Sequence, residues 1–333
     1  MSLISFFRKI SSAVTDWFAR NLSGESAAPM PLDQPIPPRK VLLVSFNPRI
    51  PSRAGQRLID VMGWHNPENL IAAYQTDLLT SSAGAARYLI VERMEIDALP
   101  VLEDGFQYNP NQFLALLRAG GGFHQPEGAD YQRIVAEFQL VARVAAGEID
   151  EVWLFGPPYA GFYESRMAGR DAFWCNAPPL SRTEPAGRRF MLMGFNYERG
   201  VAEMLESFAH RVESIMKYTY RKQHGEENLW ERFIRHEKTH PRRAEVGTVH
   251  FAPNSLADYD WGNQTMVLSR AYTWHHFPDL SGEARMVNCS EWGDGDARAH
   301  KLWWLSHLPH QVGSANGISY QWWQYILDPQ GVQ

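Results

Sequence analysis

The body of this chain opens on an uninterrupted apolar run, KVLLVSF at residues 40–46, which ends before Asn47. Continuous hydrophobicity, rather than alternation, is typical of a parallel strand that is covered on both faces. Similar apolar runs follow at residues 88–91, 151–155 and 189–195. We therefore predict four strands of one largely parallel sheet.

Helical periodicity fills the intervals between these strands. It is visible at residues 110–119, at 130–146 before Gly147, and from about Glu198 to Tyr218. Glycine often follows the last residue of a helix, so Gly147 is a plausible end for the second segment. The alternation of strands and helices indicates an α/β fold with a doubly wound sheet.

The last 90 residues are less regular, because glycines and prolines interrupt them throughout. We expect long loops there, with two short helices near residues 298–308 and 319–327. The chain is long enough for one large core, so we predict a single α/β domain, residues 40–333, with a loop-rich, Trp-rich C-terminal region packed on its sheet. Seven of the 12 tryptophans fall in this region: Trp261, Trp274, Trp292, Trp303, Trp304, Trp322 and Trp323.

The first 22 residues predict an amphipathic helix, followed by a proline-rich linker at residues 23–39. Arg8, Lys9 and Asp16 interrupt the apolar residues along the sequence, whereas a cleavable secretory signal needs an uninterrupted apolar block. The helix either folds back on its own domain or binds a membrane surface or a protein partner. No apolar run approaches the roughly 20 residues of a membrane-spanning helix. We therefore expect a cytoplasmic or peripheral membrane protein, or one delivered by its docking helix. The apolar face consists of Leu3, Phe6, Phe7, Ile10, Val14, Trp17 and Phe18.

Several functional classes are disfavoured. A formal charge of -5 argues against a dedicated nucleic-acid-binding domain. The glycine-rich motifs that hold nucleotide phosphates are absent after the strands, so we expect no nucleotide cofactor. The nucleophile motif of α/β-hydrolases is also missing. Cys175 and Cys289 form no Cys-x-x-Cys pair, and they either make one disulfide or remain free thiols.

Ligands of open parallel sheets bind beyond the carboxyl ends of the strands, and this rule selects candidate site residues. Glu164 and Glu198 are the predicted catalytic acid and base, with Tyr163 as a third catalytic candidate. Asn47 and Asn196 are predicted to bind substrate. The alternative is that all five are ordinary turn residues.

A second group of residues is typical of a metal site. Glu206 and His210 lie four residues apart on one helical face, and His250 ends a short apolar segment that Asp258 follows closely. Imidazole and carboxylate groups together bind zinc and similar divalent metals, so we predict these four as ligands. The alternatives are a solvated helical surface and a buried histidine bonded to a backbone carbonyl.

Two further features concern ligands. Trp274 and His275 lie in a polar, proline-flanked loop, and we expect them to be exposed and to stack on a sugar. Residues 217–243 hold eight Lys or Arg and four Glu, which indicates either a surface for an anionic polymer or a solvated helical face.

Three functions fit these patterns. The first is a hydrolase that acts on a glycan or cell-envelope-type polymer, with or without the assistance of a metal ion such as zinc. The second is a non-catalytic carbohydrate-binding module that uses Trp274 to hold a polysaccharide. The third is an assembly or cargo protein that docks through residues 1–22.

Overall fold

A computed structural model of this chain describes residues 35–332. The predicted helix at 1–22 and residues 23–34 of the predicted linker lie outside the described residues. No helix among residues 35–332 combines the length and the apolar character needed to cross a membrane.

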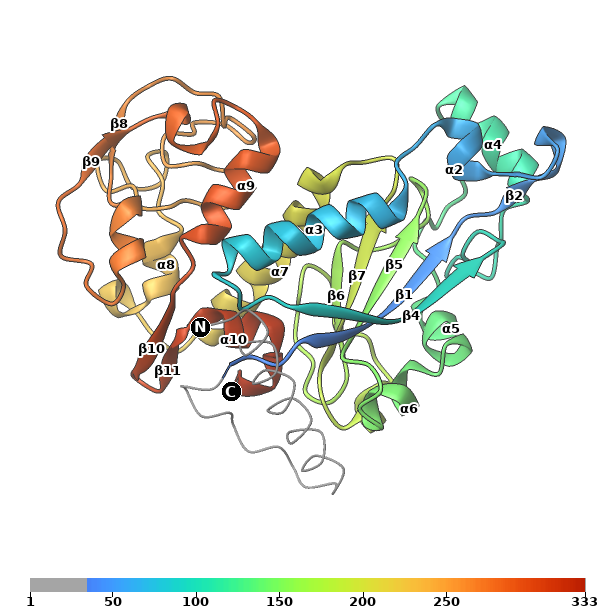
Figure 1. The fold of residues 1–333 in the computed structure, drawn as a ribbon, viewed down its shortest axis with the longest axis horizontal. Coiled ribbons are helices and arrows are strands. Elements are labelled where there is room, and N and C mark those ends of the chain that lie inside the picture. Colours follow the sequence, from blue (N-terminus) through green and yellow to red (C-terminus); the bar gives the residue numbers. More distant parts are fainter. Residues whose placement is uncertain (1–34, 333) are drawn as a thin grey trace, which may run out of the picture.

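The centre of the fold is a five-stranded, mostly parallel sheet (Figure 1). Its strand order is β4-β1-β5-β7-β6, and only the edge strand β6 is antiparallel to its neighbour. The four predicted strands are confirmed, and β6 is an addition. The strands are β1 (Arg39–Phe46), β4 (Tyr88–Ile96), β5 (Glu151–Gly156), β6 (Ser165–Ala168) and β7 (Phe190–Asn196).

Helices pack against both faces of this sheet. Successive residues of β1 point to opposite faces, so Leu43 belongs to the core under α3 (Pro67–Ser81) and α7 (Val201–Thr219), and Leu42 belongs to the core under the α5 and α6 helices. The continuous apolar character of β1 follows from this double coverage.

One predicted helix, at residues 130–146, is two helices in the structure. The first, α5 (Tyr131–Glu137), and the second, α6 (Leu140–Ala145), are separated at Gln139. Gln139 has a positive φ of 53°, which ends the regular right-handed geometry.

The remaining elements before α7 are β2 (Arg49–Ile50), β3 (Gln56–Arg57), α2 (Leu58–Met62), α4 (Pro110–Ala119), and the 3-10 turns η2 (Pro51–Arg53) and η3 (Glu184–Ala186).

The C-terminal third lies beside α7 and α3, as the orange and red part of Figure 1 shows. The expected helix near 298–308 is α9. The one near 319–327 is confirmed as α10 from residue 322, but residues 319–321 belong to β11, which forms a hairpin with β10. The elements are η4 (Gly225–Glu227), α8 (Leu229–Phe233), β8 (Val267–Ser269), η5 (Ala271–His276), β9 (Arg285–Val287), η6 (Cys289–Trp292), α9 (Ala297–Ser306), β10 (His310–Ala315), β11 (Ile318–Gln321), α10 (Trp322–Leu327) and η7 (Pro329–Gly331).

A cluster of tryptophans holds this region against the rest of the core. Trp322 is fully buried, and its ring centroid lies 6.0 Å from that of Trp230 and 5.8 Å from that of Trp274. The expected exposure of Trp274 is wrong, because its side chain is 1% exposed and its Nε1 donates a hydrogen bond to Glu245. Cys175 and Cys289 are both free and buried.

A buried ion pair connects the sheet to α7 and α10. Arg211 of α7 is 0% exposed, and its Nη1 lies 2.8 Å from Oε2 of Glu151, the first residue of β5. Two further nitrogens of Arg211 donate to the carbonyl of Ile326 in α10. The other oxygen of Glu151 accepts a hydrogen bond from Trp153. A single guanidinium thus joins β5, α7 and α10.

Removing one member of this pair should destabilise the fold strongly. We expect Arg211→Met to lower the free energy of unfolding by about 3–5 kcal/mol, because the carboxylate of Glu151 would stay buried without a counter-ion. Arg133→Met is the matched control, since its pair with Glu137 is exposed, and it should cost less than about 1 kcal/mol. Urea denaturation measures both, and equal small losses would contradict the assigned role of Arg211.

Candidate metal centre

A pocket of about 170 Å³ lies beyond the carboxyl ends of β5 and β7. The loop that follows β5 forms one wall, and the first turns of α7 form another. Glu164 and Asn196, both predicted from their positions after strands, line it together with Glu206. The pocket therefore brings residues of the two predicted groups to one place.

The beginning of α7 determines which side chains reach this pocket. Gly200 precedes the helix, and its backbone N–H donates to the side chain of Glu203. The apolar stripe that includes Leu205 and Phe208 packs on the sheet. The helical period then places Glu206 and His210 on the opposite, polar side.

This polar side is not a solvated surface, which was one of the two alternatives. The segment from Thr248 to Tyr259 covers it, and the backbone N–H of Val249 donates to Oε1 of Glu213. The side chains of Glu206 and His210 are consequently only 14% and 17% exposed.

In both histidines of the cluster, the Nδ1 atom lies beside a carboxylate. Nδ1 of His210 lies 3.0 Å from Oε2 of Glu213, and Nδ1 of His250 lies 3.1 Å from Oδ1 of Asp258. An ionised carboxylate only accepts hydrogen bonds, so each Nδ1 is placed to donate to its carboxylate. The two rings meet edge to face with centroids 4.8 Å apart. The Nδ1 of His250 thus contacts a carboxylate and not a backbone carbonyl, which was the alternative for this histidine.

The Nε2 atoms of the two histidines face two different carboxylates. Nε2 of His250 lies 3.2 Å from Oε1 of Glu206, and Nε2 of His210 lies 3.8 Å from Oε2 of Glu164. One ligand atom each from Glu206, His210 and His250 falls within 4.8 Å of the others. These three side chains could hold a metal ion, with Glu164 beside them.

Glu206 contacts Lys301 and Tyr259 in addition to His250. Its Oε2 lies 3.0 Å from Nζ of Lys301, whose side chain is 1% exposed, and its Oε1 accepts a hydrogen bond from Tyr259. Burial raises the pKa of Glu206, but the hydrogen bond with His250 and the charge of Lys301 outweigh it and lower the pKa to about 2. Burial, together with the charge of Glu206, raises the pKa of Tyr259 to about 12.

The surroundings of His210 also favour its charged form. Burial lowers its pKa, but the hydrogen bond and charge of Glu213, with the charges of Glu164 and Glu206, raise it above the ordinary value overall. Four carboxylates (Glu164, Glu206, Glu213 and Asp258) and one lysine surround the two rings, so the formal charge is -4 + 1 = -3 before any charge on the imidazoles is counted. A bound cation would reduce this excess.

Three predicted residues lie away from the cluster. Glu198 is exposed, and its carboxylate makes no ion pair or hydrogen bond within residues 35–332. The ring of Tyr163 lies near that of Tyr131, with centroids 6.0 Å apart. Asn47 is buried, where its Oδ1 accepts a hydrogen bond from the backbone of Ile59. None of the three side chains reaches the metal-binding group.

The proposed sugar platform is not formed either. His275 is exposed as expected, but its ring lies 4.1 Å from that of His307, and Trp274 beside it is buried. Trp274 occupies the core because its indole packs on Trp322 and its N–H finds a carboxylate partner.

Two residues of the site gave no sequence signal. Lys301 follows His300 on α9, and nothing in its spacing distinguishes it from a surface lysine. Asn176 donates a 2.6 Å hydrogen bond to Oε2 of Glu164 from a loop between β6 and β7. Only the folded chain brings them to Glu164 and Glu206.

No family model matches this chain, and neither the curated proteins nor the solved structures contain a significant match to it.

The low pKa of Glu206 makes a pH-dependent contribution to stability. The folded pKa lies below the ordinary value of 4.5, so this contribution is present above about pH 4.5 and is lost as the pH falls toward 2. We expect the free energy of unfolding to fall more shallowly over this range in Glu206→Gln than in the unsubstituted protein. Urea denaturation at several pH values measures it. Glu198→Gln should retain the original slope, and identical slopes in all three proteins would contradict the assignment.

Proposed function

We propose that Glu206, His210 and His250 bind a divalent metal ion, with zinc as the best-suited candidate. The observation that carries this proposal is the orientation of the two imidazoles. Each places Nδ1 against one carboxylate and turns Nε2 toward another, which is Glu206 for His250 and Glu164 for His210. Carboxylate partners of this kind orient the histidine ligands of zinc sites and raise their basicity.

The ligand types agree with this choice of metal. Two imidazole nitrogens and one carboxylate oxygen form a common protein ligand set of catalytic zinc, which keeps its fourth position open for water or substrate. Lys301 holds Oε2 of Glu206, so Oε1, which also accepts a hydrogen bond from Tyr259, is the proposed ligand atom. Asp258, predicted as a fourth ligand, is proposed instead to orient His250 through Nδ1.

We propose metal-assisted hydrolysis as the chemistry of this pocket. A metal ion of this type lowers the pKa of bound water toward neutrality and polarises a carbonyl or phosphoryl group. Glu164 is the proposed general base, because it lines the same pocket and lies 3.8 Å from His210. Asn176 orients its carboxylate. If the sheet is doubly wound, as its strand order suggests, this location beyond β5 and β7 agrees with the ligand sites of such folds.

The proposed substrate is a polar polymer such as a glycan, and Tyr159 is the residue that supports it. Tyr159 lines the pocket, is 48% exposed and stacks on Phe123 with ring centroids 3.7 Å apart. It also has a positive φ of 62°, a strained conformation that is enriched at functional sites. An exposed ring at a pocket rim presents an apolar face on which a sugar can stack. It replaces Trp274, on which the alternative of a binding module depended. The docking helix at 1–22 remains a separate prediction.

Metal binding should depend on the two histidines. We expect one zinc ion per chain by isothermal titration calorimetry and by metal analysis, and at least a 100-fold loss of affinity in His210→Ala and in His250→Ala. Asp258→Asn should weaken binding about 10-fold, because outer partners of metal ligands typically contribute 10–100-fold.

His65→Ala and His224→Ala are the matched controls, since both side chains are exposed and lie outside the cluster. They should bind zinc as the unsubstituted protein does. Equal affinity in all of these variants would remove the proposed site.

Catalysis should depend on Glu164 and not on Glu198. On a panel of polysaccharide and cell-envelope polymers, we expect release of reducing ends or other hydrolysis products that requires the metal. Glu164→Gln should reduce the rate by about 100-fold or more, within the range for the loss of a general base. Glu198→Gln should leave the rate unchanged. Normal zinc binding without hydrolysis of any polymer would contradict the enzymatic proposal while retaining the metal site.

A further inference from the structure

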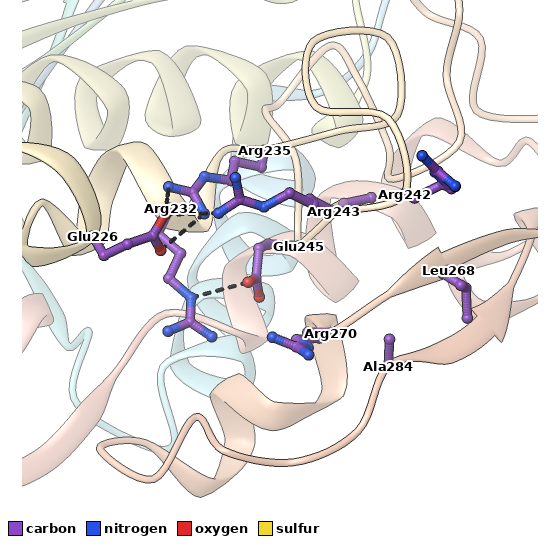
Figure 2. A pocket seen from close by; sticks show the side chains of 10 residues that line it. Glu226, Arg232, Arg235, Arg242, Arg243, Glu245, Leu268, Arg270 and Ala284 are labelled. Carbon is purple, nitrogen blue, oxygen red and sulfur yellow. Dashed lines mark hydrogen bonds and ion pairs between the residues drawn. The ribbon is translucent and has the colours of Figure 1, made fainter.

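A second pocket, of about 230 Å³, lies between α8, the loop after residue 241 and the hairpin of β8 and β9. In Figure 2 the guanidinium groups of Arg232, Arg235, Arg243 and Arg270 lie near Glu226 and Glu245, and that of Arg242 lies to one side of them. Its charged lining consists of Arg232, Arg235, Arg242, Arg243 and Arg270. Glu226 and Glu245 are its two carboxylates, so the formal charge of the lining is 5 - 2 = +3.

The two carboxylates are already used by the chain. Glu245 is buried, with one oxygen 2.9 Å from Nε of Arg232 and the other accepting a hydrogen bond from Trp274. Glu226 accepts two hydrogen bonds from Arg235 and a third, of 2.7 Å, from Arg243 (Figure 2). These arginines are held in place and cannot all be neutralised by the available acids.

Two guanidiniums of the lining have no internal partner. Arg242 and Arg270 are exposed, and neither side chain makes an ion pair or hydrogen bond within the described part of the chain. Their backbones are nevertheless anchored, because the N–H of Arg242 donates to Glu237 and that of Arg270 donates to the carbonyl of Ala244. The pocket lining therefore includes two cationic side chains with unused hydrogen-bond donors.

Glu226 shows how this pocket holds an anion. Hydrogen bonds from Arg235 and Arg243 lower the pKa of its carboxylate to about 2 even though the side chain is 61% exposed. A guanidinium fork binds the oxygens of carboxylate and phosphate groups in the same paired geometry. A charge of +3 is more than one carboxylate ligand would balance, whereas a phosphoryl group carries up to two charges and a diphosphate three or more.

We propose that this pocket binds a phosphoryl group with two or more negative charges, either as a free inorganic anion or as an ester on a larger molecule. Its volume is several times the roughly 30 Å³ that a water molecule occupies in the liquid, which leaves room for one or two phosphoryl groups. The basic stretch at 217–243, for which a solvated helical face was the alternative, supplies four of the five arginines. This site is independent of the proposed metal centre.

The test is calorimetric titration of the full chain with inorganic diphosphate at low and moderate salt. We expect binding with one site per chain that weakens with salt, because screening reduces attraction between exposed charges. Arg242→Gln combined with Arg270→Gln should weaken it at least fivefold. Glu226→Gln should tighten it, because it frees the guanidiniums of Arg235 and Arg243 and raises the charge of the lining.

The matched control is Arg53→Gln combined with Arg170→Gln, which removes the same charge from exposed arginines outside the pocket. It should bind diphosphate as the unsubstituted protein does. No measurable binding, or an equal loss in this control, would overturn the proposal. A parallel titration compares a sugar phosphate with inorganic phosphate. Tighter binding of the ester identifies an esterified ligand, and equal binding identifies the free anion.

Discussion

The buried contact between Arg211 and Glu151 is the constraint on which the rest of this fold depends. It ties the first residue of β5 to α7, and through the carbonyl of Ile326 it also ties both to α10. A guanidinium that is fully buried and held on two sides allows α7 only one rotation about its axis. His210 is its neighbour in sequence, so the same contact determines which way the metal-binding face of α7 points.

The site arises because a loop covers a polar helical face that would otherwise be solvated. His250 approaches from this loop, and Lys301 approaches from α9, so that Glu206 faces one imidazole and one ammonium group. Carboxylates exceed cations around the two imidazoles, while the arginine pocket beside α8 has the opposite imbalance. Two unbalanced charge clusters of opposite sign in one chain are the reason to assign each a ligand of the complementary sign.

Much of the fold could be predicted from the sequence, since the four apolar strands and the spacing of α7 are local signals. The pairing of Glu206 with His210 was equally visible, because it follows from helical geometry. The exposure of Trp274 was predicted wrongly, because the polarity of a loop does not reveal a buried carboxylate partner. Lys301 could not be found at all, since its role depends on a contact between residues 95 positions apart.

The most direct test of the metal centre is a crystal structure of the zinc-loaded protein with diffraction data collected at the zinc absorption edge. The account predicts one anomalous peak bonded to Nε2 of His210, Nε2 of His250 and one oxygen of Glu206, with both Nδ1 atoms still donating to their carboxylates. A peak located elsewhere, or no peak at this cluster in a zinc-saturated crystal, would contradict it.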